Sequence, residues 1–289
     1  FSNSADLLNF VTSNWTTDFV VPDLFHLYSN DPSFCLQEWT KRPFFLLVAV
    51  TAPVLTRYSR HLTLTTLPST QPTTLESFLT HDDTILYTPK TPSHIPLFKI
   101  MHKASLTITN TLPSLPSLHT HLSSPTLALL SPSRLRPSWD RYFMSLCDLA
   151  AHRSNCMKRR VGCVVTKERR VIATGYNGTP KGLRNCNEGG CARCNGGVAK
   201  CGEALETCIC LHAEENALLE AGRERISSGG RAILYCNTCP CIQCARKIIQ
   251  VGISEVVYSL SYGMDDTTKR LFLEAGVELR QLDALEDCV

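Results

Sequence analysis

Glycine is missing from the first half of this chain. All 15 glycines lie at or after Gly162, so the first 161 residues cannot form the glycine-rich loop that binds phosphate groups. The chain also has no run of about 18 apolar residues, which predicts that no segment spans a membrane. Its formal net charge is only +3, and this small excess argues against a strongly basic, nucleic-acid-binding face.

Cysteine and proline are unevenly distributed, which predicts two parts of different character. Of the 15 cysteines, 14 lie at or after Cys147, whereas 11 of the 16 prolines lie between Ala52 and Ser138. We place the boundary near Arg136–Pro137. The predicted parts are an N-terminal segment, a linker rich in Pro, Ser and Thr, and a C-terminal domain, at residues 1–110, 111–136 and 137–289.

The cysteines recur at Cys-x-x-Cys and Cys-x-Cys spacings near a histidine. We expect no signal peptide, so metal-bound thiolates in a reducing compartment are a better interpretation than disulfides of a secreted protein. We therefore expect the protein in the cytoplasm, with the nucleus as an additional location.

The N-terminal segment has features of an α/β fold. Ala5–Trp15 has helical spacing, and Pro43–Val50 is a buried-strand pattern that ends at Ala52-Pro53 and leads into Arg57 and Arg60. This order resembles the later half of P-loop nucleotide kinases, over about residues 1–110. Because the phosphate-binding loop is absent, we expect a degenerate scaffold or oligomerisation module. Farther on, we expect a helix at His94–Asn110 and a loop at Leu112–Ser124.

From Trp139 the pattern becomes regular and alternates between strand and helix. Hydrophobic spacing and glycine stops predict helices at Trp139–Arg153, Leu211–Ala221, Cys241–Val251 and Thr267–Ala275, and strands at Val161–Thr166, Val171–Tyr176, Ala232–Cys236, Glu255–Tyr258 and Val277–Arg280. Right-handed crossovers then give a five-stranded mixed sheet with helices on both faces, which is an α/β/α architecture in three layers.

Four residues predict a catalytic zinc site. Cys241 and Cys244 lie three apart at a helix start, where they share a face and the helix dipole favours the thiolate form. With His212 they give three zinc ligands and leave a fourth position for water. Two thiolates make the water less acidic than an all-histidine site does, so a carboxylate is needed as proton acceptor, and Glu214 is the candidate. This His-x-Glu and Pro-Cys-x-x-Cys pattern is the signature of zinc-dependent nucleobase deaminases.

The spacing of His212 and Glu214 constrains the helix that carries them. Residues two apart on a regular helix point in nearly opposite directions, so both can serve one pocket only if the helix begins at about His212. We expect Glu215 to be a solvated helix charge. Cys239 is spaced too closely to Cys241 for joint ligation, so we exclude it as a ligand.

Further motifs narrow the family. The run from Arg153 to Gly162 and the Gly-Tyr-Asn-Gly-Thr-Pro sequence ending at Pro180 accompany the metal motif, and together they resemble deoxycytidylate (dCMP) deaminases, the fungal enzymes most, over residues 137–282. The resemblance implies a cytidine-deaminase-like fold and hydrolytic deamination of dCMP to dUMP and ammonia, which supplies dUMP for thymidylate synthesis. In this reaction a zinc-activated water attacks C4 of cytosine, and Glu214 shuttles the proton.

The resemblance also implies substrate contacts. The Asn177 amide is expected to bond the sugar or phosphate, Gly178 to let backbone N–H groups approach, and Pro240 to help hold the base. A tight Asn-Gly turn is the alternative for the first two. The 5′-phosphate needs cationic partners, and the candidates, among which the sequence does not choose, are Arg153, Lys158, Arg159 and Arg160.

Other cysteines suggest a second, structural zinc. Cys156, Cys186 and Cys210 fall where some family members carry such ligands, and Cys208, Cys191 or Cys194 could be the fourth, with free loop thiols as the alternative. Family members are often homo-oligomers that dCTP activates and dTTP inhibits.

Two other functions compete with this interpretation. A deaminase acting on nucleic acid or on another cytosine nucleotide would share the metal motif, but a nucleic-acid enzyme should have a basic, aromatic-lined groove. A non-catalytic, zinc-stabilised interaction protein should lack the carboxylate, whereas Glu214 is present. We therefore expect a small nucleotide as ligand, with neither nucleic acid nor membrane as partner.

Overall fold

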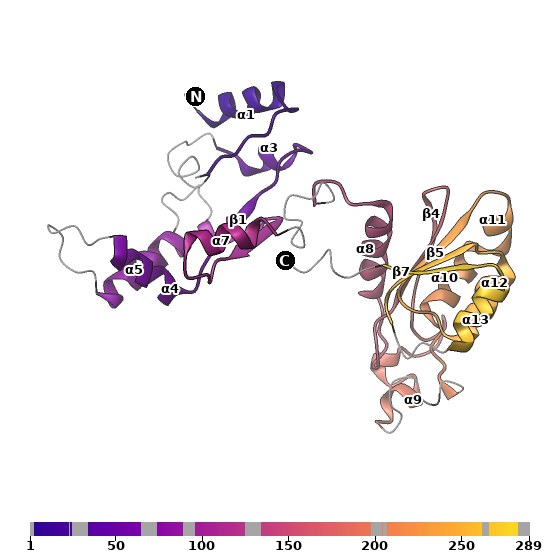
Figure 1. Ribbon diagram of the computed structural model, residues 1–289. Helices are drawn as coiled ribbons and strands as arrows, with labels where there is room; N and C mark the ends of the chain where they lie inside the picture. Colours follow the sequence, from indigo (N-terminus) through magenta and orange to yellow (C-terminus); the bar gives the residue numbers. More distant parts are fainter. Residues whose placement is uncertain are drawn as a thin grey trace. The chain divides into compact units, whose positions relative to one another are not determined.

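The computed structural model divides the chain into two compact units, Phe1–Arg136 and Pro137–Cys288 (Figure 1). None of the helices in the part of the chain that it describes is both long and apolar enough to cross a membrane. The described residues are 3–22, 24, 34–64, 74–88, 96–124, 134–197, 204, 207–261 and 266–282.

The first unit is built on a short parallel sheet. Strands β1 (Val48–Thr51) and β2 (Leu106–Thr109) pair with Val48 opposite Leu106. A small apolar core includes Leu8, Trp39 and Ile100. The helices are α1 (Ser4–Ser13), α3 (Leu36–Thr40), α4 (Val54–Leu64), α5 (Leu75–Tyr87), α6 (Leu97–Met101) and α7 (Leu115–Leu122).

Two expectations for this unit are wrong. The single helix expected at His94–Asn110 is instead α6 followed by β2, because Leu106 and Ile108 alternate with exposed threonines and pair with β1. The loop expected at Leu112–Ser124 contains α7. That helix begins after Ser114, whose Oγ accepts the backbone N–H of Ser117, and a proline occupies its first turn.

The second unit contains the predicted five-stranded mixed sheet, in the order β4-β3-β5-β6-β7. The first two neighbouring pairs are antiparallel, and β5, β6 and β7 are mutually parallel. In the β3–β4 hairpin, Glu168 and Arg169 take φ values of 48° and 59°, as a tight turn requires. The strands are β3 (Gly162–Lys167), β4 (Arg170–Tyr176), β5 (Ala232–Thr238), β6 (Glu255–Leu260) and β7 (Glu278–Gln281).

Helices cover both faces of this sheet, which confirms the three-layer prediction (Figure 1). Residues alternate along each strand, so Val164 packs with α8 (Trp139–Ala151) on one face, while Val165 belongs to the core of the other. That second core includes side chains of α10 (Ala213–Ala221), α12 (Ile242–Val251) and α13 (Asp266–Glu274). Shorter helical segments are η2 (Cys186–Glu188), α9 (Ala192–Asn195) and α11 (Arg223–Ser227).

Helix α10 approaches the sheet closely because strand β4 carries glycine at the crossing point. A Cβ atom on Gly175 would lie 2.2 Å from the carbonyl oxygen of Ala213 and 2.4 Å from the backbone nitrogen of Ala217. Both atoms belong to the α10 backbone, which cannot yield as a flexible side chain would. The first turn of α10 is therefore held directly against the end of β4.

We expect Gly175→Ala to lower the free energy of unfolding by at least about 2 kcal/mol, because α10 must move away from the sheet to admit the methyl group. Chemical denaturation of the full chain measures this change. Thr174→Ala, at an exposed position on the same strand, is the matched control and should have a small effect. An unchanged unfolding midpoint for Gly175→Ala would contradict the close packing.

Candidate active site

His212 lies at the start of α10, as predicted. It is the N-cap residue, with extended backbone angles, and its N–H donates to Oε2 of Glu215 at 3.0 Å. Glu215 also forms an ion pair with Lys247 of α12. The expectation that Glu215 is a solvated charge is therefore wrong: it caps the helix and links the two helices that carry the motif. A carboxylate three residues after the N-cap is a capping signal that the sequence already contained.

The structure brings His212 together with Cys241 and Cys244. The Nδ1 atom of His212 lies 3.5 Å from the sulfur of Cys241 and 3.3 Å from that of Cys244. Around a tetrahedral zinc with ordinary bond lengths, nitrogen and sulfur ligands are about 3.6 Å apart. All three ligand atoms lie within 4.8 Å of one another, so these side chains fit a zinc ion with only small adjustments.

The two thiols are prepared for metal binding by the helix start. Cys241 is the N-cap of α12, and Cys244 lies on its first turn. A hydrogen bond from the Cys244 thiol, assisted by His212, lowers the pKa of Cys241 to about 4, while the pKa of Cys244 is raised. The pair therefore gives up its first proton readily, and a dication is needed to hold both as thiolates.

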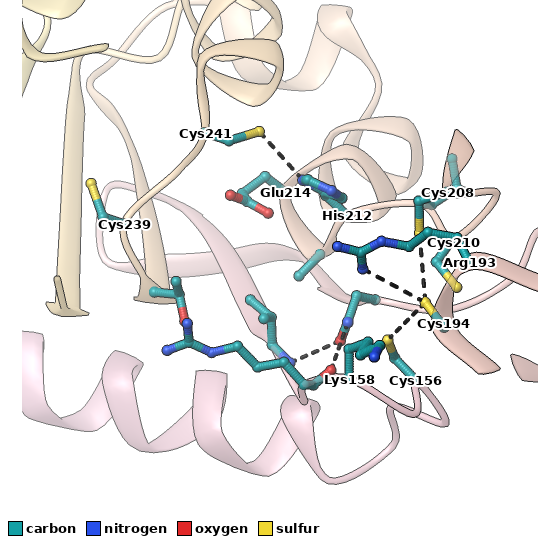
Figure 2. A pocket seen from close by; sticks show the side chains of 16 residues that line it. Cys156, Lys158, Arg193, Cys194, Cys208, Cys210, His212, Glu214, Cys239 and Cys241 are labelled. Atoms are coloured by element: carbon teal, nitrogen blue, oxygen red, sulfur yellow. Dashed lines mark hydrogen bonds between the residues drawn. The ribbon is translucent and has the colours of Figure 1, made fainter. Parts of the chain in front are cut away.

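Glu214 lies beside His212 and Cys241 (Figure 2). Only 4% of its surface is exposed, and burial raises its pKa. A raised pKa brings a carboxyl group closer to the value at which it can both accept and donate a proton near neutral pH. The site thus pairs a metal-ligand group with a proton carrier.

One pocket joins these residues to cationic and polar side chains. His212, Glu214 and Cys241 line it, as do Lys158 and Arg159 from the predicted phosphate-binding run. Arg153 and Arg160 are not among its lining residues, and Arg193, which the sequence interpretation did not consider for this role, is. The other lining residues are Cys156, Val161, Asn177, Cys194, Cys208, Cys210, Leu211, Ala213, Thr238 and Cys239.

Thr238 is a lining residue that sequence reasoning did not assign. Its hydroxyl is buried, and within the described part of the chain it has no hydrogen-bond partner. A buried hydroxyl without a partner is costly unless a ligand satisfies it. The sequence signal that could have identified Thr238 as a pocket residue is its position just before Cys239 and Pro240. A threonine by itself does not indicate a binding site.

Asn177 lies at the end of β4, but its amide is mostly engaged within the protein. Its Oδ1 accepts hydrogen bonds from Ser154 Oγ at 2.7 Å and from the N–H of Val161 at 2.8 Å, and its Nδ2 donates to the carbonyl of Arg159 at 2.8 Å. Only one amide hydrogen remains for a nucleotide. Asn177 therefore positions the backbone of the segment that carries Lys158 and Arg159.

Gly178 forms backbone hydrogen bonds within the chain, and the role expected of Pro240 stays a prediction. The N–H of Gly178 donates to the carbonyl of Leu211 at 3.2 Å, so it serves the chain rather than a phosphate group. The reciprocal bond, from Leu211 N–H to Gly178 O, is 2.9 Å and fixes the residue before His212. Pro240 is buried next to Cys241 but does not line the pocket, so its contact with the base stays a prediction.

The predicted second group of cysteines is present, and its fourth member is one of the three candidates that the sequence left open. Cys156, Cys186 and Cys210 lie together with Cys194, and all four sulfur atoms are within 4.8 Å of one another. Cys208, another of those three candidates, lies in a second group with Cys191, Cys194 and Cys210. Cys239 lies at the pocket, outside the His212 group.

Comparisons with known proteins agree with this geometry. The family model for the cytidine and deoxycytidylate deaminase zinc-binding region matches residues 137–260. Deoxycytidylate deaminase of Schizosaccharomyces pombe is 49% identical over 276 residues, covering 96% of this chain and 80% of that protein. The Saccharomyces cerevisiae deoxycytidylate deaminase is 43% identical, covering 99% and 88%.

A shorter relative matches less than half of this chain. Deoxycytidylate deaminase of Mycobacterium phage D29 is 42% identical over 127 residues, which are 95% of that protein but only 43% of this chain. The zinc-binding region of the family model contains His212, Glu214, Cys241 and Cys244. Because two yeast deoxycytidylate deaminases align with nearly the whole chain at 49% and 43% identity, this chain belongs to the cytidine and deoxycytidylate deaminase family.

Proposed function

We propose that this chain catalyses the hydrolytic deamination of dCMP to dUMP and ammonia, and so supplies dUMP for thymidylate synthesis. One observation carries the proposal: a buried carboxyl group, Glu214, lies beside the zinc-ligand group His212, Cys241 and Cys244 in a pocket that also contains cationic side chains. The two yeast relatives, named deoxycytidylate deaminases and aligned over nearly the whole chain, support dCMP as the substrate.

The residues divide the chemistry between them. Zinc, when bound by His212, Cys241 and Cys244, supplies a Lewis acid that activates a water molecule for attack on C4 of cytosine. Glu214 accepts one proton of that water and delivers it to N3. It then takes the proton of the new C4 hydroxyl and passes it to the amino group, which leaves as ammonia while the C4 carbonyl forms. The buried position of Glu214 excludes bulk water from these transfers.

The rest of the pocket fits a mononucleotide. Lys158, Arg159 and Arg193 provide positive charge for a 5′-phosphate, and Asn177 holds the first two in place through the Arg159 carbonyl. The buried Thr238 hydroxyl can satisfy a polar atom of the base or sugar.

A substrate panel tests this proposal. The zinc-loaded full chain is incubated with dCMP, deoxycytidine, dCTP and a cytosine-containing oligonucleotide, and ammonia release is measured. We expect dCMP to have the highest kcat/KM, because the cationic side chains of the pocket can bind its 5′-phosphate, which deoxycytidine lacks. Turnover of the oligonucleotide without turnover of dCMP would contradict the proposed substrate.

We also propose that the reaction resides in the second unit. The short phage relative supports this, since a deoxycytidylate deaminase of that length leaves no room for a counterpart of residues 1–136. Residues 1–110 then act as a kinase-like scaffold or oligomerisation module. Homo-oligomerisation, control by dCTP and dTTP, and a cytoplasmic or additional nuclear location stay predictions.

The cysteine-rich segment before His212 is proposed to bind structural zinc. Four thiols around one point, within 4.8 Å of one another, support this assignment over free loop thiols. Such a site would fix the segment that forms one side of the pocket.

A further inference from the structure

Six cysteines form one buried cluster in the segment that precedes His212. They come from several short elements, with Cys186 on η2, Cys194 on α9 and Cys210 just before Leu211. Four of the six are less than 10% exposed, and the other two are partly buried. One tetrahedral zinc ion accepts only four of these six thiolates. The six are Cys156, Cys186, Cys191, Cys194, Cys208 and Cys210.

The cluster divides into two overlapping groups of four. Cys156 and Cys186 lie with Cys194 and Cys210, and Cys191 and Cys208 lie with the same two residues. Within each group all sulfur atoms are within 4.8 Å of one another. Cys194 and Cys210 therefore belong to both groups, and each of the other four cysteines belongs to one.

The sulfur separations match zinc coordination. The Sγ atoms of Cys156 and Cys194 are 3.8 Å apart, those of Cys191 and Cys208 are 3.8 Å apart, and those of Cys194 and Cys208 are 3.7 Å apart. Two thiolates on one tetrahedral zinc are separated by about 3.8 Å. A disulfide would bring two sulfur atoms to about 2.05 Å, and all six thiols are free.

We propose that these six cysteines form a binuclear zinc–thiolate cluster, in which Cys194 and Cys210 bridge two zinc ions. Each ion then has two terminal and two shared thiolates, which completes both tetrahedra with these six thiols. The inference rests on the proposal that this segment binds structural zinc, and it specifies two ions rather than one.

Positively charged side chains lie near the cluster, as a site of six thiolates and two zinc ions requires. Six thiolates and two divalent ions leave a net charge of −2, which a buried site must offset. The guanidinium group of Arg193 contacts Cys194, one of the two cysteines that belong to both groups, and its Nη1 lies 4.0 Å from the Cys194 sulfur (Figure 2). Lys158, two residues after Cys156, lines the same pocket as four of the cysteines.

The cluster is connected to the catalytic group by the chain itself. Cys210 is two residues before His212, and Leu211 between them is fixed by its two hydrogen bonds with Gly178. Cys156, Cys194, Cys208 and Cys210 line the pocket that contains Glu214. The two ions would therefore hold the wall of the pocket and the segment leading to its first metal ligand.

Metal counting on the full chain tests the number of ions. After exchange into metal-free buffer, elemental analysis should give three zinc ions per chain, one on the His212 group and two on the cluster. Two ions per chain would overturn the binuclear assignment while leaving one structural zinc. One ion, or disulfides among the six cysteines by thiol titration, would overturn both. None of these measurements depends on dCMP turnover, so a failure of the cluster proposal can be distinguished from a failure of the proposed activity.

Cadmium-113 NMR tests the bridging directly. In the cadmium-substituted chain we expect two signals typical of four sulfur ligands, coupled to each other through the shared thiolates, and a separate signal from the His212 group. Two uncoupled four-sulfur signals, or only one, would contradict bridging by Cys194 and Cys210. Because this measurement uses the unsubstituted sequence, it holds even where a cysteine variant fails to fold.

Terminal-ligand variants complete the test. Cys191→Ser removes a thiolate from one ion only, so it should lower the zinc content from three ions to two and abolish the cadmium coupling. Cys156→Ser should do the same for the other ion. Cys35→Ser, an exposed thiol outside the cluster, is the control and should retain three. A Cys191→Ser protein that keeps three ions and the coupling would overturn the assignment of that ligand.

Discussion

Glu214→Gln is expected to lower kcat for dCMP deamination by about 10⁴-fold, at the upper end of what one acid–base group contributes. The reason is that one carboxyl group carries the proton through every step, and glutamine can neither accept nor release it. KM should change little, because the amide keeps the size of the side chain. Steady-state kinetics with ammonia detection measure both constants.

The matched control for this variant is Glu220→Gln, on the same helix at an exposed position. It should retain normal kinetics. Zinc content should be normal in both variants, because neither residue belongs to the metal-ligand group. Undiminished turnover by zinc-loaded Glu214→Gln would contradict the role of Glu214 as proton carrier.

Cys241→Ser should abolish deamination by a different route. The serine hydroxyl does not ionise at neutral pH, so the His212 group loses one of its two thiolates and its zinc. We expect the zinc content to fall by one ion per chain and kcat/KM to fall by more than about 10³-fold, since several kcal/mol of transition-state stabilisation are lost.

Cys239→Ser is the control that separates the loss of a zinc ligand from the loss of any thiol that lines the pocket. Cys239 lines the same pocket two residues earlier, but it lies outside the His212 group. This variant should keep its zinc and most of its activity. If Cys239→Ser lost the ion and Cys241→Ser kept it, the ligand assignment would be wrong.

Part of the site could be predicted from sequence because its constraints are local. The His-x-Glu spacing requires a helix that begins at about His212, and α10 begins there. Cys241 and Cys244 share the first turn of α12 for the same reason. The order of strands and helices in the second unit likewise follows from periodicity and glycine stops, which act over a few residues.

Other features could not be predicted because they depend on contacts between distant residues. Asn177 forms hydrogen bonds with Ser154 and Val161, and no spacing rule identifies these partners, so the sequence alone does not show that its amide is engaged within the protein. The grouping of Cys208 with Cys191 was also inaccessible, since spacing along a loop does not determine which thiols meet. In the first unit, β2 is only four residues long, too short for its period to be distinguished from that of a helix.

The most direct test of the central claim is deamination of dCMP in water enriched in heavy oxygen (18O). The zinc-loaded full chain should convert dCMP to dUMP that carries one heavy oxygen at C4, with one ammonia released per dUMP. Mass spectrometry of the product and an ammonia assay read both quantities from one reaction. No dUMP from the zinc-loaded protein, or dUMP without the heavy oxygen, would contradict hydrolytic deamination at this site.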